Sequence, residues 1–180
     1  MPKLDQTRPF IPVQIAVLTV SDTRGIAEDK SGDALVQMIA QAGHVVADRA
    51  IVKDDIEAIR AKVRAWIADA AIDVVITTGG TGFTGRDVTP EAVRPLFEKE
   101  IEGFSTVFHM ISFDKVGTST IQSRACGGLA QGTYIFCLPG SPGACKDAWN
   151  GILVHQLDNR HRPCNLVEIM PRLEEHRRKC

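Results

Sequence analysis

Short apolar runs alternate along this chain with longer stretches in which apolar residues recur every three or four positions. Three of the runs are rich in β-branched residues, as is typical of strands buried on both faces: residues 14–20, 44–52 and 72–78. The stretches between them have one apolar stripe each, which predicts amphipathic helices. Because strands and helices take turns, the pattern predicts a parallel sheet with helices on both faces.

Polar residues mark where the helices begin. Ser31 is expected to cap the first helix. Asp54 or Asp55 starts the second. Thr89 is expected to cap a third helix, with Pro90 at its first position.

The second half of the chain departs from strict alternation. Residues 98–112 are rich in Phe and Met and predict a helix. Two strand-like runs then flank Gln131-Gly132, which indicates a hairpin. Ser141 and Pro142 suit the cap and first position of a last long helix. The predicted fold class is therefore α/β with three layers, a mostly parallel sheet with one antiparallel hairpin, and helices on both faces.

One domain is expected, over residues 13–170. Residues 1–12 contain three prolines and no periodicity, and are interpreted as a mobile or docking arm. Residues 171–180 are a run of charges, typical of a solvated tail.

Composition and charge restrict the classes of partner that this chain is expected to bind. The formal net charge of −1 leaves no basic field to hold nucleic acid. No apolar run approaches the length of a membrane span, and the N-terminus lacks the apolar core of a signal peptide, so a cytoplasmic protein without a membrane partner is expected. The five cysteines form no C-x-x-C pair and the five histidines are scattered, so neither a disulfide framework nor a zinc site is indicated.

Small, hydroxylic and acidic residues follow each predicted parallel strand. In order along the chain they are Ser21 and Asp22; Asp54; Thr78, Gly79, Gly80, Thr81 and Gly82; and Ser141, Pro142 and Gly143. Ligands of open α/β sheets bind beyond the carboxyl ends of the strands, where these residues would meet. The convergence predicts a binding site on that edge of the sheet.

The glycine loop fits no common nucleotide motif. Residues 80–85 match G-x-G-x-x-G, but four further residues precede Pro90, and the loop follows the third strand instead of the first. A P-loop would need a lysine that is absent here. An NAD-dependent enzyme is disfavoured because no acidic residue follows the glycine loop, near the end of a second strand, at the distance that the ribose would need. The loop is either a nest of amides for an anion or a tight turn. The amides of residues 143–145, at a helix start, are expected to form a second anion site.

Acidic residues beside such loops need an explanation, because like charges repel. Asp54 and Asp87, with Asp22 nearby, would suit Mg²⁺ bound between carboxylates and phosphates. These acids could also accept hydrogen bonds from an amino-pyrimidine-like ring edge, and the further alternative for Asp54 and Asp87 is helix capping. Arg86 and Arg124 either neutralise phosphate or are surface cations.

The combination of "TTGGTG", "RDVTPEA" and "LPGSPGA" resembles the molybdopterin-binding domain family. The likeness extends over roughly residues 12–168 and includes "AVLTVSDTRG" and "RPCNL". It implies a three-layer domain that binds molybdopterin. In active members, the domain transfers AMP from Mg-ATP to the terminal phosphate of that pterin.

The resemblance also implies roles for residues. Gly79 to Gly82 would be the substrate-binding loop and Ser141 to Gly143 a second binding turn, while Asp54 and Asp87 would be the catalytic acids and hold Mg²⁺. Asp55 is the rival of Asp54. Because both acids are present, an adenylyltransferase is favoured over a non-catalytic pterin-binding or scaffold oligomer. Family members form homo-oligomers, trimers or hexamers, and other molybdenum cofactor biosynthesis proteins are candidate partners.

Two segments stay open. The predicted 98–112 helix and its end carry more apolar residues than one face needs, which predicts either an interface between copies or a fully buried helix: Phe104, Val107, Phe108, Met110, Ile111 and Phe113. Residues 117–120 (GTST) and Arg124 either line the pterin pocket or turn the chain before the hairpin.

Overall fold

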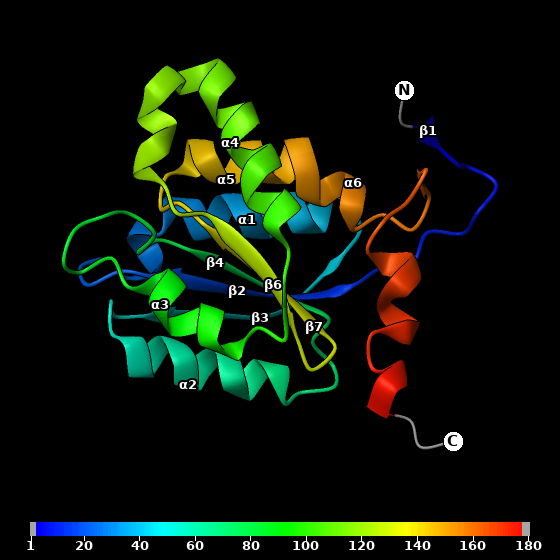
Figure 1. Cartoon of the computed structure of the whole chain (residues 1–180), viewed down its shortest axis with the longest axis horizontal. Helices are drawn as coiled ribbons and strands as arrows, with labels where there is room; N and C mark the ends of the chain where they lie inside the picture. Colours follow the sequence, from blue (N-terminus) through cyan, green and yellow to red (C-terminus); the bar gives the residue numbers. More distant parts are fainter. Residues whose placement is uncertain (1–2, 178–180) are drawn as a thin grey trace.

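A six-stranded sheet in the order β3-β2-β4-β7-β6-β5 forms the centre of the computed structural model, which describes residues 3–177 (Figure 1). The parallel strands are β2 (Gln14–Val20), β3 (Val45–Val52), β4 (Val74–Thr78) and β7 (Thr133–Leu138). The antiparallel strands β6 (Cys126–Ala130) and β5 (Lys99–Glu100) complete one edge. The expected fold class and the hairpin at residues 131–132 are confirmed.

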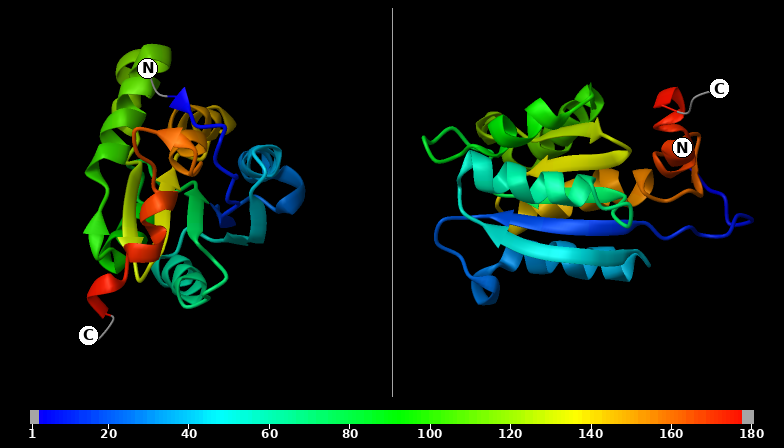
Figure 2. Two further views of the ribbon diagram at one scale, coloured as in Figure 1. Left: turned by 90° about the vertical axis from the view of Figure 1, so that its right-hand side faces the viewer. Right: turned by 90° about the horizontal axis from the view of Figure 1, so that it is seen from below.

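Helices cover both faces of the sheet (Figures 1 and 2). One face carries α1 (Lys30–Gln41), α4 (Glu102–Val116), α5 (Pro142–Ala148), a π-helical stretch (Trp149–Leu153) and α6 (Val154–Gln156). The other face carries α2 (Ile56–Ile67) and α3 (Thr89–Val93). Short 3₁₀ helices are η1 (Ile26–Glu28), η2 (Arg94–Leu96), η3 (Gly117–Gln122), η5 (Val167–Arg172) and η6 (Glu175–Arg177).

The central strands are buried on both sides, so their side chains feed two cores. In β2, Ile15 and Val17 pack towards α1 and α5, while Ala16 and Leu18 pack towards α2. All four are fully buried. Burying such a Val, Leu or Ile side chain stabilises by about 1.5–3 kcal/mol, which explains why these runs are continuously apolar.

Two helix starts differ from expectation. Asp29, and not Ser31, caps α1, because its carboxylate accepts the Gly32 amide at 2.9 Å. Helix α3 begins at Thr89 itself, after Val88, with no side-chain cap. The hydroxyl of Thr89 instead donates to the carbonyl oxygen of Gly79 at 2.8 Å. This hydroxyl, which was expected to cap the helix, therefore makes a tertiary contact.

The prediction of a helix from residue 98 is also wrong at its start. Lys99 and Glu100 form β5, paired with Leu129 and Gly128, and α4 begins only at Glu102. A Cβ atom on Gly128 would overlap the ring of Phe97. Glycine at this position of β6 therefore leaves room for the Phe97 side chain, which comes just before β5. This pairing joins residues far apart in sequence, and local periodicity does not reveal it.

The ends of the described chain pack on the domain. Lys3–Leu4 (β1) pair antiparallel with His161–Arg162 (β8), and the amide of Asp5 donates to the carbonyl oxygen of Arg160 at 2.9 Å. Thus the described part of the 1–12 segment is docked. In the charged tail, Arg177 forms ion pairs with Glu98 and Glu174, and residues 178–180 lie outside the described part. Within residues 3–177, no helix has the length and apolar character needed to cross a membrane.

Candidate functional site

The carboxyl ends of β2, β3, β4 and β7 open at the same edge of the sheet, on the left in Figure 1. The loops that follow them surround a cavity of about 1010 Å³. Most of the residues proposed for the site line it: Ser21, Asp54, Gly79, Gly80, Thr81, Gly82, Asp87, Ser141, Pro142 and Gly143. Parallel pairing alone therefore brings together four segments that are widely separated in sequence.

Two of the proposed residues do not line this cavity. Asp22 lies at the rim, where its carboxylate accepts hydrogen bonds from Arg86 Nε at 2.8 Å and Nη2 at 2.7 Å, and from the Asp54 amide at 3.3 Å. Thr78 is buried at the end of β4, and its hydroxyl donates to the carbonyl oxygen of Pro139 at 2.9 Å. Asp22 thus ties two loops together, and Thr78 joins β4 to the turn after β7.

Glycine is required at the start of the loop after β4. Gly79 and Gly80 have φ of +101° and +64°, a region that side chains disfavour. A Cβ on Gly79 would overlap the carbonyl oxygen of Val20, and one on Gly80 would overlap the Thr89 hydroxyl. The backbone here passes close to its neighbours. The Gly79 amide donates to the carbonyl oxygen of Leu138 at 3.1 Å and the Gly82 amide binds the Asp87 carboxylate, so these two amides already have partners.

Asp54 and Asp87 flank this glycine segment. A Cβ on Gly80 would lie 2.9 Å from Asp54 Oδ1, and a Cβ on Gly82 would lie 2.9 Å from Asp87 Oδ2. Asp55 points elsewhere, because its carboxylate accepts the Ala58 amide at 2.8 Å and caps α2. Of the two rival acids after β3, Asp54 is therefore the one at the cavity.

The two acids differ in their pKa. Burial raises the pKa of Asp54, and the nearby charges of Asp22 and Asp87 raise it further. Burial also opposes ionisation of Asp87, but hydrogen bonds from the hydroxyl (2.6 Å) and amide (2.9 Å) of Thr84 and the charge of Arg124 bring its pKa below the ordinary value. A cation between the carboxylates would relieve the repulsion that raises the Asp54 pKa.

These acids fit Mg²⁺ in one specific way. Among the described residues, no group of three or more His, Cys, Asp or Glu could hold a metal by itself. Mg²⁺ needs no such cage, because it keeps several waters and is usually held by one or two carboxylates together with substrate phosphates. The donor set here suits a magnesium ion that arrives with a phosphorylated substrate.

The turn after β7 offers fewer amides than the sequence suggested. The Ser141 hydroxyl accepts the Ala144 amide at 3.1 Å, and the Ser141 carbonyl accepts the Cys145 amide at 3.1 Å. These bonds cap α5 as expected, but they use two of the three amides proposed for an anion. The expected second anion site over residues 143–145 is therefore wrong for Ala144 and Cys145.

The opposite wall of the cavity comes from α4, η3 and α5. Its polar residues were not singled out in advance, except in the GTST segment: Ser112, Lys115, Ser119, Thr120, Gln122, Ser123 and Asp147. Lys115 and Asp147 form an ion pair across the wall, and the buried Thr120 hydroxyl has no hydrogen-bond partner in the described chain. The second half of the GTST segment, Ser119 and Thr120, therefore lines the cavity. Only its position against α4 could show this, because the segment itself contains no motif.

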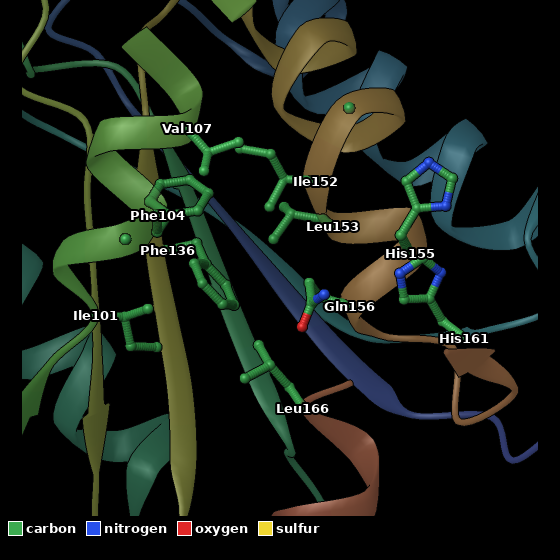
Figure 3. Close-up of a pocket in the computed structure, with 12 residues that line it drawn as sticks. Ile101, Phe104, Val107, Phe136, Ile152, Leu153, His155, Gln156, His161 and Leu166 are labelled. Carbon is green, nitrogen blue, oxygen red and sulfur yellow. The ribbon is translucent and has the colours of Figure 1, made fainter. Parts of the chain in front are cut away.

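A second, smaller hollow of about 400 Å³ lies between α4 and α6 (Figure 3). Apolar side chains such as Phe104, Val107, Ile152 and Leu166 line it, and Gln156 projects into it. It contains none of the proposed site residues and no carboxylate. His155, His161 and Gln156 are the polar residues of this mostly apolar lining.

Comparison with known proteins gives one consistent result. The family model described as "Probable molybdopterin binding domain" matches residues 16–159. Molybdenum cofactor biosynthesis protein B of Escherichia coli K12 is 55% identical over 156 residues, which are 87% of this chain and 92% of the relative. The protein of the same name from Bacillus subtilis 168 is 44% identical over 146 residues, 81% of this chain and 86% of the relative.

Solved structures agree. A crystal structure of molybdenum cofactor biosynthesis protein B superimposes with a TM-score of 0.83 at 41% identity, covering 95% of this chain and all of the other. The tungsten cofactor synthesizing protein MoaB from Pyrococcus furiosus gives 0.67 at 37% identity, covering 77% and 89%. A structure of MogA gives 0.71 at 29% identity, covering 80% and 97%.

Proposed function

Because this chain belongs to the molybdopterin-binding domain family, together with proteins named molybdenum cofactor biosynthesis protein B, we propose that it binds molybdopterin and transfers AMP to it from Mg-ATP. The observation that supports this activity is the glycine segment Gly79–Gly82, with Asp54 at one end and Asp87 at the other, on the edge of one large cavity. Amides and paired acids in one place suit phosphate and Mg²⁺ together.

The reaction asks the protein mainly to hold charged groups in line. An oxygen of the pterin phosphate attacks the α-phosphorus of ATP, and a new P–O bond forms. The bond from the α-phosphorus to the oxygen bridging to the β-phosphate breaks, and pyrophosphate leaves with that electron pair. Catalysis of such transfers comes from positioning and from neutralising charge, which the loops and the paired acids around the cavity are placed to supply.

Asp54 and Asp87 are the residues that would hold Mg²⁺. The ion supplies charge neutralisation on the triphosphate. The protein's own contribution is to keep both carboxylates close to the loop, and the Thr84 hydrogen bonds also favour the ionised form of Asp87.

The test replaces each acid with its amide. We expect Asp54→Asn and Asp87→Asn to bind molybdopterin and to melt nearly as the unchanged protein does, but to transfer AMP at least about 100-fold more slowly, as when one electrostatic group is lost from an active site. Incorporation of AMP into molybdopterin in the presence of Mg²⁺ measures this. Asp55→Asn is the matched control, because Asp55 caps α2 and does not line the cavity.

The pH dependence gives a second readout. Burial and neighbouring charges raise the pKa of Asp54, so it takes up a proton at a higher pH than an ordinary carboxyl group. Transfer and Mg²⁺ affinity should therefore fall as the pH drops through that raised pKa, and Asp54→Asn should remove this limb. Rates that stay unchanged in both amide variants would rule out the metal-carboxylate role.

A non-catalytic pterin-binding or scaffold oligomer is the second candidate. Its oligomeric part is supported by the exposed apolar side chains of α4, where Met110 is 64% and Phe113 55% exposed. We propose that this face forms an interface in a cytoplasmic homo-oligomer, a trimer or hexamer, under either function. Tight binding of molybdopterin with no Mg-ATP-dependent product would decide for the non-catalytic alternative.

A further inference from the structure

Arg124, which lies between η3 and β6, makes most of its contacts with the loop after β4. Its Nε donates to the carbonyl oxygens of Gly82 at 2.9 Å and Thr81 at 3.3 Å, and its Nη2 donates to that of Asp87 at 2.9 Å. Its own amide donates to Thr81 at 3.0 Å. Nη1 forms an ion pair with Glu91 on α3, so each guanidinium nitrogen has a partner.

These contacts tie both ends of the loop to one rigid group. Between Gly82 and Asp87 the loop is mostly exposed, and Phe83, which is 70% exposed, stacks against the guanidinium at 5.5 Å. A planar guanidinium holds several acceptors in a fixed fork, which an ammonium group cannot do. Arg86 also binds the Asp22 carboxylate, and Thr84 binds that of Asp87, but Arg124 is the side chain that holds the carbonyl groups at both ends of this stretch.

The direction of the peptide planes connects Arg124 to the site. In a trans peptide, the C=O and N–H bonds point in opposite directions. Since Arg124 binds the carbonyl oxygen of Thr81, the amide of Gly82 in the same peptide faces the other way. That amide lies against the Asp87 carboxylate and helps to lower its pKa.

This arrangement differs from a phosphate-binding role for the arginine. Arg124 is not among the residues that line the large cavity, and its side chain is only 24% exposed. We propose that Arg124 is a positioning residue, which fixes the loop 81–87 so that the Asp87 carboxylate, held by the Gly82 and Thr84 amides, faces the cavity. Its effect on catalysis rests on the proposed function, whereas its effect on the loop does not.

The test compares Arg124→Lys with the unchanged full-length protein. Lysine keeps the charge and loses the fork. We expect hydrogen exchange of the amides in residues 81–88 to become at least about tenfold faster while the rest of the sheet stays protected. For AMP transfer we expect kcat to fall about 10- to 100-fold, as is typical of a small misplacement of catalytic groups, with KM for ATP changed less than about threefold.

Arg60→Lys is the matched control. Arg60 also binds two carbonyl oxygens, those of Glu91 and Ala92 at 3.2 Å, and one carboxylate, Glu57, but it does so from α2 and away from the loop. It should change neither loop exchange nor kcat. Glu91→Gln is a milder variant that removes only the ion pair, and it should shift both readouts in the same direction as Arg124→Lys but less.

The outcomes separate the two proposals. If Arg124→Lys folds and the exchange of residues 81–88 is unchanged, Arg124 does not position the loop. If the unchanged protein is active, and Arg124→Lys speeds up exchange but has the same kcat, the catalytic part of the inference is wrong. If the unchanged protein forms no adenylylated product at all, the proposed function fails, and hydrogen exchange still decides the role of Arg124.

Discussion

Replacement of Asp29 by alanine should test how the loop after β2 is held beside the cavity. Asp29 is fully buried, and its carboxylate accepts hydrogen bonds from the Thr19 hydroxyl at 2.7 Å, the Gly32 amide at 2.9 Å and Arg49 Nη2 at 2.7 Å. It therefore ties β2, the start of α1 and β3 together at one point. The loop that it closes contributes Ser21 to the cavity wall.

The expected loss of stability follows from these contacts. Removing one partner of a buried ion pair costs about 3–5 kcal/mol, and a buried hydroxyl left without an acceptor costs about 1–3 kcal/mol. Arg49 is 22% exposed and keeps Asp33 as a second partner, so the cost of breaking the ion pair is reduced. The two costs also overlap, because one carboxylate makes both contacts. We expect Asp29→Ala to lower the free energy of unfolding by about 3 kcal/mol, or Tm by about 6–12 °C.

Chemical denaturation followed by tryptophan fluorescence measures this loss, because Trp66 and Trp149 are both buried. Asp33→Ala is the matched control. Asp33 pairs with the same arginine at 2.7 Å but its side chain is 60% exposed, so we expect about 0.5 kcal/mol or less. A loss for Asp29→Ala below about 1 kcal/mol, or equal to that of the control, would refute the reasoning.

The pH dependence of the free energy of unfolding gives a second test of the Asp29 contacts. Burial raises the pKa of Asp29, but Arg49, Thr19 and the Gly32 amide together bring it below its ordinary value. The stabilisation is therefore present at neutral pH and is lost as the pH falls through the lowered pKa. The difference between the unchanged protein and Asp29→Ala should shrink in acid.

Two further variants test the loop and the helix face. Gly79→Ala should destabilise the fold by roughly 3 kcal/mol or more, because φ is +101° and the new Cβ would overlap the Val20 carbonyl. Thermal melting measures this loss. Gly85→Ala is the control, because its Cβ would lie in open space, and it should melt like the unchanged protein. Met110→Glu combined with Phe113→Glu should leave the circular dichroism spectrum intact and convert the proposed oligomer to monomer in sedimentation velocity, since both side chains are more than half exposed; an unchanged protein that is already monomeric at micromolar concentration would contradict the interface.

Most of the site could be predicted, because its residues sit directly after strands. Asp54, Gly80 and Ser141 each follow an apolar run, and the carboxyl ends of parallel strands share one edge. For the second wall, the sequence left only the GTST segment as an open alternative and did not indicate the remaining residues. Lys115 and Thr120 come from a helix and a turn whose orientation over the sheet depends on the packing of Phe104 and Phe108.

The sequence by itself determined the order of strands and helices and the place of the glycine loop, because these depend on periodicity and on local backbone preferences. Only the tertiary structure decided which polar groups meet. Asp29 caps α1, Thr89 binds Gly79, β5 joins the sheet and Arg124 turns to the loop carbonyls through contacts between residues far apart in the chain. A side chain with several hydrogen-bonding choices takes the partner that folding brings near, and no local pattern specifies that partner.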